Sequence, residues 1–485
     1  MVTRLAARNG GRAGLAALVA ILLLGVGLRV GEAWDGRAPV YDAKAYARIA
    51  ANLDEGRGFT VGAGATQPSS NYSPGLPLLV AGAYKSTGGV HERFARILLA
   101  LIGSLAVLFT YLIGRRLSRS MHQPHPGVEN ASVAAGLIGA GAVAIYPALL
   151  EYQGMLMSEP LAATLLSAAV LAMLWASEPS GGWRKGGGSR TYVSPAAPPL
   201  SRQDLSARWL VPGLLLGATA MVRPEYLGVA VLLVFAVLVR GLRSDWRRSL
   251  SQAAILLAGV VIVIAPWTIR NAATQDRFVP ISTGGGQVLF AGTYLPSNGN
   301  PERVGAEVVA RHPGLFAPED AQRLRLEQIL ARLAAQRYPN LETDKALSRM
   351  GREQLWDDIS EEPLEYAGFV ATKVGRIWSH GPRDVMREPV WEALHWALVG
   401  LGLLGLVVLA WRRRWEALLL ATIFLSITAL SALLVASPRR VLVMLPLVAA
   451  LAGVGATWIW CAFREGRQDG VPPGPAKETL SPGRT

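Results

Sequence analysis

The chain has 485 residues, of which 51% are hydrophobic and 17% are charged. The apolar residues come in blocks of about 15 to 24, which exclude a soluble domain and indicate a polytopic membrane protein. The formal net charge of +14 is carried by short basic clusters at the ends of these blocks, a topology signal that predicts no nucleic-acid partner.

The first apolar run extends from about Leu15 to Val30 and follows a basic N-terminal region with Arg4, Arg8 and Arg12. This order resembles a secretory signal, but no small-x-small cleavage site follows before Asp42. We therefore expect an uncleaved first membrane span.

The apolar pattern predicts an all-α protein of about ten transmembrane helices. The expected spans are residues 13–31, 92–114, 131–149, 160–176, 209–222, 226–240, 251–269, 391–411, 416–436 and 441–463. With both termini in the cytoplasm, every short inner loop is basic, so the positive-inside rule is satisfied. The expected location is the plasma (inner) membrane.

The first long polar loop opens with Asp42 at the start of a predicted amphipathic helix, residues 42–55. Ala45, Ile49 and Leu53 share one side at helical spacing, and glycines follow the helix. Such a helix can lie on a membrane surface. Asp42 would be held at its N-terminal end by the helix dipole and free backbone N–H groups.

The predicted organisation has membrane-embedded parts and polar parts. The expected parts are an N-terminal membrane domain (1–270) with outer loop 32–90, a disordered cytoplasmic linker (178–206), an extracytoplasmic helical region (271–389), C-terminal membrane helices (390–465) and a disordered cytoplasmic tail (470–485). Within the extracytoplasmic region, residues 319–337, 345–361 and 363–378 are predicted helices. Residues 276–293 are predicted to be extended with a glycine turn, which disfavours a phosphate-cradling loop.

Ionisable residues gather on the outer side. The outer ends of spans carry Arg223 with Glu225, Arg270, and Arg439 with Arg440, and the turn LLEYQGMLMSEP adds Glu151 and Glu159. A single arginine at a helix C-terminus is stabilised by the dipole and can snorkel to the interface. Four outer arginines run against the positive-inside bias, and guanidinium groups bind phosphate oxygens bidentately, so they indicate a lipid-phosphate site.

The sequence contains no pattern that indicates a metal site or cysteine chemistry. The six histidines are scattered without an H-E-x-x-H pattern, and Cys461 is the only cysteine. We expect no metal site and no cofactor. A divalent cation is compatible with the sequence, but no motif indicates one.

Several motifs together resemble the GT-C class of integral-membrane glycosyltransferases. The chain shows Asp42 with an aromatic four residues on, AANLDEGRGF, YSPGLP, SEPL, and a PWxxRN…RFVPIS segment from Pro266 to Ser282. The resemblance is greatest to the mannosyltransferase and aminoarabinose-transferase-like group. The family often shows Asp-Glu in the first loop, whereas this chain has Asp42-Ala43.

The resemblance implies a GT-C-type bundle with a catalytic first outer loop. It implies Asp42 as the catalytic carboxylate and Glu159 as either a second active-site carboxylate or a helix cap. Tyr46 and Tyr72 are expected at the acceptor side of the loop. Arg439 and Arg440, with Arg270 or Arg223, would hold the donor phosphate.

The expected activity is a hexosyl- or pentosyltransferase with inversion, in which Asp42 acts as general base. The partners would be a polyprenyl-phosphate sugar donor, a glycan, lipid or protein acceptor, and membrane lipid. A lipid or sugar transporter is the alternative, although the span interiors are almost free of charge and show no repeat. A non-catalytic scaffold on the same fold is a third reading.

Overall fold

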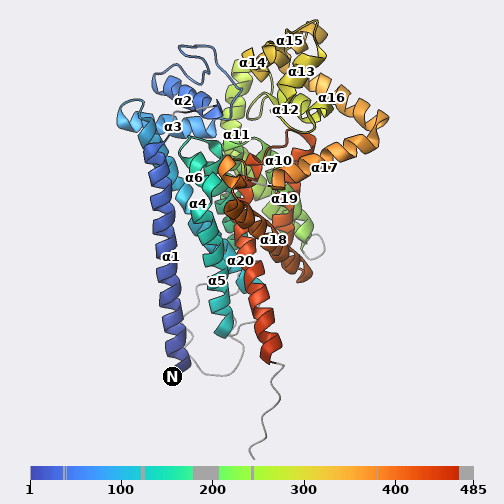
Figure 1. Cartoon of the computed structure of the whole chain (residues 1–485). Helices are drawn as coiled ribbons and strands as arrows, with labels where there is room; N and C mark the ends of the chain where they lie inside the picture. Colours follow the sequence, from blue (N-terminus) through green and yellow to red (C-terminus); the bar gives the residue numbers. More distant parts are fainter. Residues whose placement is uncertain are drawn as a thin grey trace, which may run out of the picture.

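The computed structural model describes residues 2–36, 39, 41–121, 126–178, 207–241, 245–379 and 381–468. Helices dominate these residues, and none of them forms a strand. The predicted tail, and the predicted linker except for Glu178, lie outside the described residues. Long helices form the lower part of the molecule in Figure 1, and shorter helices form a layer above them.

All ten predicted apolar segments are mainly helical, although the first helix begins at Val2 instead of residue 13, the second ends at Met121 instead of residue 114, and segment 131–149 is divided. They are α1 (Val2–Asp35), α4 (Glu92–Met121), α5 (Pro126–Ile145), α7 (Ser158–Ala176), α9 (Leu210–Val222), α10 (Glu225–Gly241), α11 (Trp246–Gln275), α18 (Pro389–Trp411), α19 (Trp415–Leu433) and α20 (Arg439–Gln468). Seven are long and apolar enough to cross a membrane, and α5 makes an eighth with α6. The chain is a multi-pass membrane protein.

The helices α9 and α10 are shorter than a full span. They have 13 and 17 residues, which at ~1.5 Å per residue reach about 20 and 26 Å against a hydrocarbon core of ~30 Å. Neither helix is therefore long enough to cross the hydrocarbon core, and the turn that joins them lies short of the membrane surface if their other ends are at the opposite surface. This turn carries Arg223.

The predicted span 131–149 does not continue as one helix. It breaks at Tyr146, and α6 (Pro147–Gln153) continues at an angle of 52° to α5. Proline has no N–H for the helix ladder and pushes the preceding residue out of the helical region, which explains the break. The bend turns the Glu151 and Glu159 segment inward over the bundle.

The helix α20 packs against α4, α5, α7 and α18, so it occupies the middle of the bundle. Glycines allow its backbone to approach its neighbours closely: a Cβ on Gly453 would lie 2.0 Å from the Ala135 carbonyl oxygen, and one on Gly455 would lie 2.3 Å from that of Leu401. Small residues at helix crossings are the usual means of packing in membranes. Because α20 begins at Arg439, this central position brings Arg439 under the outer layer.

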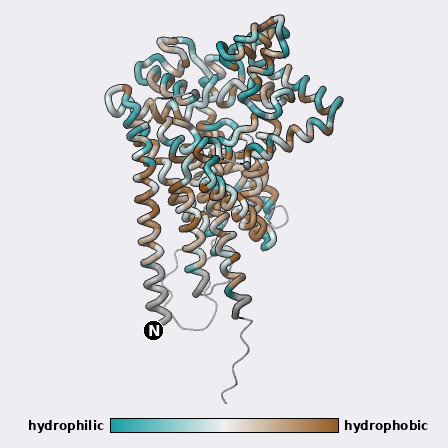
Figure 2. The backbone as a smooth tube through the Cα atoms, viewed as in Figure 1, coloured by the Kyte–Doolittle hydropathy of each residue, from teal (hydrophilic) through white to brown (hydrophobic). Residues whose placement is uncertain are grey.

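The outer layer contains many hydrophilic residues, drawn in teal along its backbone in Figure 2. It contains α2 (Tyr41–Asp54), α3 (Gly75–Thr87), α12 (Gly285–Thr293), η1 (Leu295–Ser297), α13 (Val304–Arg311), α14 (Asp320–Arg323), α15 (Leu326–Arg337), α16 (Thr343–Glu361), α17 (Pro363–Ser379) and η2 (Asp384–Arg387). The predicted helices 42–55, 345–361 and 363–378 are confirmed as α2, α16 and α17. The predicted helix 319–337 is instead two helices, because Leu324 and Arg325 are extended.

The prediction of extended structure over residues 276–293 was wrong for its second half. The glycine run begins α12, with Gly284 at φ 94° before the first turn. The Gly286 N–H donates to the Asp344 carboxylate at 2.9 Å, and a Cβ on Gly286 would meet the Asp344 carbonyl oxygen at 2.0 Å. These glycines dock α12 onto α16, a tertiary contact that local pattern does not reveal.

A lysine is buried where the outer layer meets the bundle. Lys373 of α17 is 1% exposed, and its Nζ donates to the Gly292 carbonyl oxygen at 2.6 Å. Burial, with a smaller contribution from Arg440, lowers the pKa of Lys373 from its ordinary 10.5 to about 7. The folded state therefore binds fewer protons than the unfolded state between these two pH values, and stability rises with pH there.

We expect the unfolding temperature of the wild type to rise relative to that of a Lys373→Met variant as pH increases from 7 to about 10. Below pH 7 the difference between the two proteins should stay constant, because Lys373 is then charged in both states. Thermal unfolding in detergent across this range checks the prediction. A difference that does not change with pH contradicts it.

Candidate active site

The site begins with Asp42 in the first turn of α2. Ala43, Ala47 and Ala50 of this helix are buried against the bundle, while the Asp42 side chain is 44% exposed. Gly56 and Gly58 follow the helix with φ 78° and 73°, a backbone conformation that glycine adopts without strain. Ala43 is fully buried, so the residue that follows Asp42 points into the protein.

Arg439 contacts Asp42 from the start of α20. Its Nη2 lies 3.2 Å from Asp42 Oδ2, and its Nε donates to Glu159 Oε1 at 2.8 Å. The guanidinium also lies over the Tyr152 ring, 5.6 Å from the centroid. A cation in the first turn of a helix is disfavoured by the dipole. Stabilisation by the dipole, which requires a helix C-terminus, therefore does not apply to Arg439, and the two carboxylates compensate its charge instead.

Glu159 is fully buried in the first turn of α7, where the helix dipole favours a carboxylate. Its Oε1 accepts from Arg439 and is 2.9 Å from Arg223 Nη1. Leu156, three residues earlier, has a left-handed backbone at φ 54° although it is buried. Strain of this kind persists only where the surroundings enforce it. Here it accompanies the sharp turn that starts α7.

Arg223 and Arg440 complete the cluster differently. Arg223, after the end of α9, is bonded to both Glu159 and Glu225, with its Nη2 2.7 Å from Glu225 Oε1. Arg440 donates to the Val435 carbonyl oxygen at 2.6 Å and to Ser431 Oγ at 3.0 Å. It makes no ion pair with a carboxylate among the described residues, so its charge is the least compensated of the three.

The three carboxylates of Asp42, Glu159 and Glu225 lie in the first turns of α2, α7 and α10. Each is bonded to an arginine, and no three Asp, Glu, His or Cys side chains among the described residues are placed to hold a metal ion. A divalent cation prefers several free oxygen ligands, so these residues do not fit one. The exposed Asp42 can accept a proton, whereas the oxygen of buried Glu159 is used by two guanidiniums.

The structure does not bring Arg270 to this cluster. Its Nη1 donates to the Ser69 carbonyl oxygen at 2.7 Å, and its guanidinium lies over the rings of Phe59 and Trp267. Buried Asn271 donates to the carbonyl oxygens of Val279 and Ile281 at 3.1 and 3.0 Å. The PWxxRN…RFVPIS segment therefore holds the first outer loop onto α11.

Tyr46 and Tyr72 pack edge to face, with ring centroids 5.8 Å apart. Burial raises the pKa of the Tyr46 hydroxyl, and the charges of Asp42 and Glu159 raise it further, so the group stays neutral and can donate. A Cβ on Gly75 of the YSPGLP turn would lie 2.9 Å from the Met221 carbonyl oxygen. This close approach holds the turn against the end of α9, beside Arg223.

Sequence reasoning missed Tyr152 and Ser158 as site residues. Tyr152 lies under Arg439, and Ser158 Oγ is 3.4 Å from Arg223 Nη1. Ser158 precedes Glu159 in the SEPL motif, so its place in that motif was an available signal. Tyr152 sits in a bent segment, and nothing in the sequence distinguishes its ring from a core tyrosine.

The arrangement of these helices is that of a known class. The chain has the GT-C fold of integral-membrane glycosyltransferases, with a layer of short helices over a bundle of long ones. No protein-family model matches the sequence, and no curated protein sequence matches it.

Two solved structures of one protein carry the likeness. The oligosaccharyltransferase AglB from Archaeoglobus fulgidus, in complex with an inhibitory peptide and a dolichol-phosphate, matches with a TM-score of 0.52 and 16% identity over 96% of this chain and 52% of that chain. Its apo form matches with a TM-score of 0.51 and 14% identity over 94% and 51%. The chain thus spans about half the length of these proteins. ArnT from Cupriavidus metallidurans, bound to undecaprenyl phosphate, gives a TM-score of 0.38 and 13% identity over 94% of this chain and 81% of that chain.

Proposed function

We propose that the protein is a membrane glycosyltransferase that moves a sugar from a polyprenyl-phosphate donor to a hydroxyl-bearing acceptor on the extracytoplasmic face. One observation carries the proposal: an accessible aspartate faces an arginine that a buried glutamate holds in place. Sugar transfer from a lipid phosphate requires a base that takes the acceptor proton and cations that stabilise the departing phosphate. The AglB structure with dolichol-phosphate supports the same class of donor.

In this proposal Asp42 takes the proton of the acceptor hydroxyl. The hydroxyl oxygen attacks the anomeric carbon as the bond from that carbon to the phosphate oxygen breaks, and the configuration at the carbon inverts. The electron pair of the broken bond leaves with the lipid phosphate. Tyr46, four residues from Asp42 and neutral, would donate a hydrogen bond to the acceptor beside it.

The departing phosphate needs positive charge that is not already neutralised. Arg440 meets this need best, because its hydrogen-bond acceptors are a carbonyl and a hydroxyl oxygen. Arg439 and Arg223 would stabilise the phosphate from the other side while Glu159 holds both guanidiniums. Glu159 then acts as a positioning residue. Arg270 is not part of this proposal because the first outer loop occupies its guanidinium.

The lipid donor follows from where the cluster lies. Nucleotide sugars are kept in the cytosol, and the basic clusters at the opposite ends of the spans favour an extracytoplasmic position for Asp42. The short α9 and α10 would leave Arg223 below the outer surface, next to lipid. Labelling of an Ala63→Cys variant in a Cys461→Ser background by an impermeant thiol reagent, in intact cells, tests this orientation.

The function itself is tested with purified protein in lipid nanodiscs and a panel of radiolabelled polyprenyl-phosphate sugars. Transfer of label to a glycan, lipid or protein fraction, with release of polyprenyl phosphate, is the expected result. The same panel supplied as nucleotide sugars without lipid is the control. Transfer from the nucleotide sugars would overturn the proposed donor class.

A further inference from the structure

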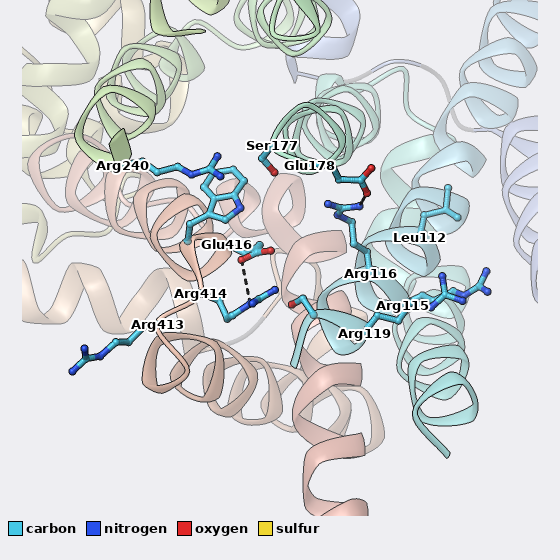
Figure 3. Close-up of a pocket in the computed structure, with 12 residues that line it drawn as sticks. Leu112, Arg115, Arg116, Arg119, Ser177, Glu178, Arg240, Arg413, Arg414 and Glu416 are labelled. Carbon is cyan, nitrogen blue, oxygen red and sulfur yellow. Dashed lines mark hydrogen bonds and ion pairs between the residues drawn. The ribbon is translucent and has the colours of Figure 1, made fainter. Parts of the chain in front are cut away.

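A cavity of about 620 Å³ opens at the end of the bundle opposite to Asp42 (Figure 3). It lies between α4, α7, α10 and the α18–α19 turn. Its walls carry six arginines: Arg115, Arg116, Arg119, Arg240, Arg413 and Arg414. Figure 3 shows Arg116, Arg240 and Arg414 around the same space, whereas Arg413 points away from it.

The carboxylates around this cavity do not balance the arginines. Arg115 and Arg119 share Glu129, Arg116 pairs with Glu178, and Arg414 is 3.8 Å from Glu416. Arg240 makes no ion pair with a described carboxylate and instead lies over the Trp415 ring, 4.4 Å from the centroid. The cavity therefore keeps an excess of positive charge.

Hydrogen-bond donors in the walls are also unsatisfied. The Nε atoms of Arg115, Arg116 and Arg414 are buried and have no acceptor among the described residues. The separation of 3.8 Å between Arg414 Nε and Glu416 Oε2 is too long for a hydrogen bond, and Glu416 Oε2 is also buried without a hydrogen-bond partner among the described residues. Buried donors in native proteins normally have a partner, which can be a bound ion or water.

The cavity lies at the level of a membrane interface. Trp175, Trp246, Trp411 and Trp460 are exposed at this end of α7, α11, α18 and α20. Tryptophans of this kind mark the headgroup level of a bilayer. Leu112 and Trp415 give the cavity an apolar wall beside the arginines, so an amphipathic anion fits better than a fully solvated one.

We propose that this cavity binds the phosphate group of an anionic phospholipid from the adjacent leaflet. Basic pockets between membrane helices suit such headgroups, and each arginine near the surface adds to their retention. The site is separate from the Asp42 cluster, and the proposal does not depend on the proposed transfer reaction.

The test uses delipidated full-length protein and native mass spectrometry, with phosphatidylglycerol as ligand and phosphatidylcholine as the neutral comparison. Arg119→Gln with Arg240→Gln removes two charges, and no carboxylate loses its last partner because Glu129 keeps Arg115 and Glu416 keeps Arg414. Phosphatidylglycerol affinity should fall roughly thirtyfold. Arg208→Gln with Arg247→Gln is the matched control, since both arginines lie at the same end over tryptophans and outside the cavity.

An equal loss of affinity in the two double variants would overturn the proposal, because it would reduce the effect to surface charge. Release of phosphatidylglycerol by an equal concentration of inorganic phosphate would also overturn it, since the site would then take a soluble anion. A second measurement needs only the wild type. A headgroup-photoreactive phosphatidylglycerol should cross-link to peptides covering residues 112–120 or 413–416, and cross-links confined to other segments contradict the site.

Discussion

Replacement of Asp42 by Asn should lower the rate of sugar transfer by ~10² to 10⁴, the usual effect of losing a positioned general base. Asparagine keeps nearly the same shape and can still meet Arg439, whose other partner, Glu159, stays in place. The protein should therefore reach the membrane in normal amounts. Single-turnover transfer from the active donor of the labelled panel, at equal protein concentration, measures the effect.

Asp54 offers a matched control at the other end of the same helix α2. Asp54→Asn removes an equal charge from the same loop, and Asp54 makes no ion pair with the arginines of the cluster among the described residues, so transfer should remain near the wild-type rate. Wild-type transfer by the Asp42 variant would remove the catalytic assignment. An equal loss in both variants would assign the effect to the charge of the loop.

The membrane helices could be predicted from the sequence because bilayer thickness dictates the length of apolar blocks. The errors occurred where tertiary contacts decide. Residues 285–293 form α12 because Gly286 fits against Asp344, and the span at 131–149 breaks where Pro147 follows Tyr146. Neither the partner of a glycine nor the direction of a bend is visible in local periodicity.

For the candidate site, sequence reasoning grouped Asp42, Glu159, Arg223 and Arg439 because topology puts them at the same side of the membrane. The structure brings these four together. Topology alone could not separate Arg270 from them, since it lies on the same side but is bonded to the first outer loop. Topology alone also could not show which of the two carboxylates, Asp42 or Glu159, is accessible, because the burial of Glu159 depends on how α7 packs below the α6 bend.

The second large effect is expected at Glu159. Its carboxylate is fully buried, and one of its oxygens lies within 3 Å of both Arg439 and Arg223. Glu159→Gln keeps the shape but leaves two guanidiniums without their shared counterion, and breaking a buried ion pair costs about 3–5 kcal/mol. We expect a clear fall in the unfolding temperature in detergent. Glu151→Gln is the control: it breaks a bidentate pair with Arg383, but both side chains are partly exposed, so the unfolding temperature should fall less than in Glu159→Gln.

Activity measurements separate a positioning role of Glu159 from a catalytic one. If Glu159 holds the arginines, Glu159→Gln should raise the KM for the lipid donor more than it lowers the rate of transfer at saturating donor. Glu159→Asp keeps the charge, so it should recover much of the stability and part of the donor affinity. Addition of Arg439→Gln to the Gln variant should restore part of the stability, with a coupling energy of about 0.5–3 kcal/mol, because it removes one of the two cations that have lost the Glu159 carboxylate. A Glu159→Gln protein that is as stable as the wild type, binds donor normally and transfers sugar as slowly as Asp42→Asn would instead make Glu159 the proton acceptor.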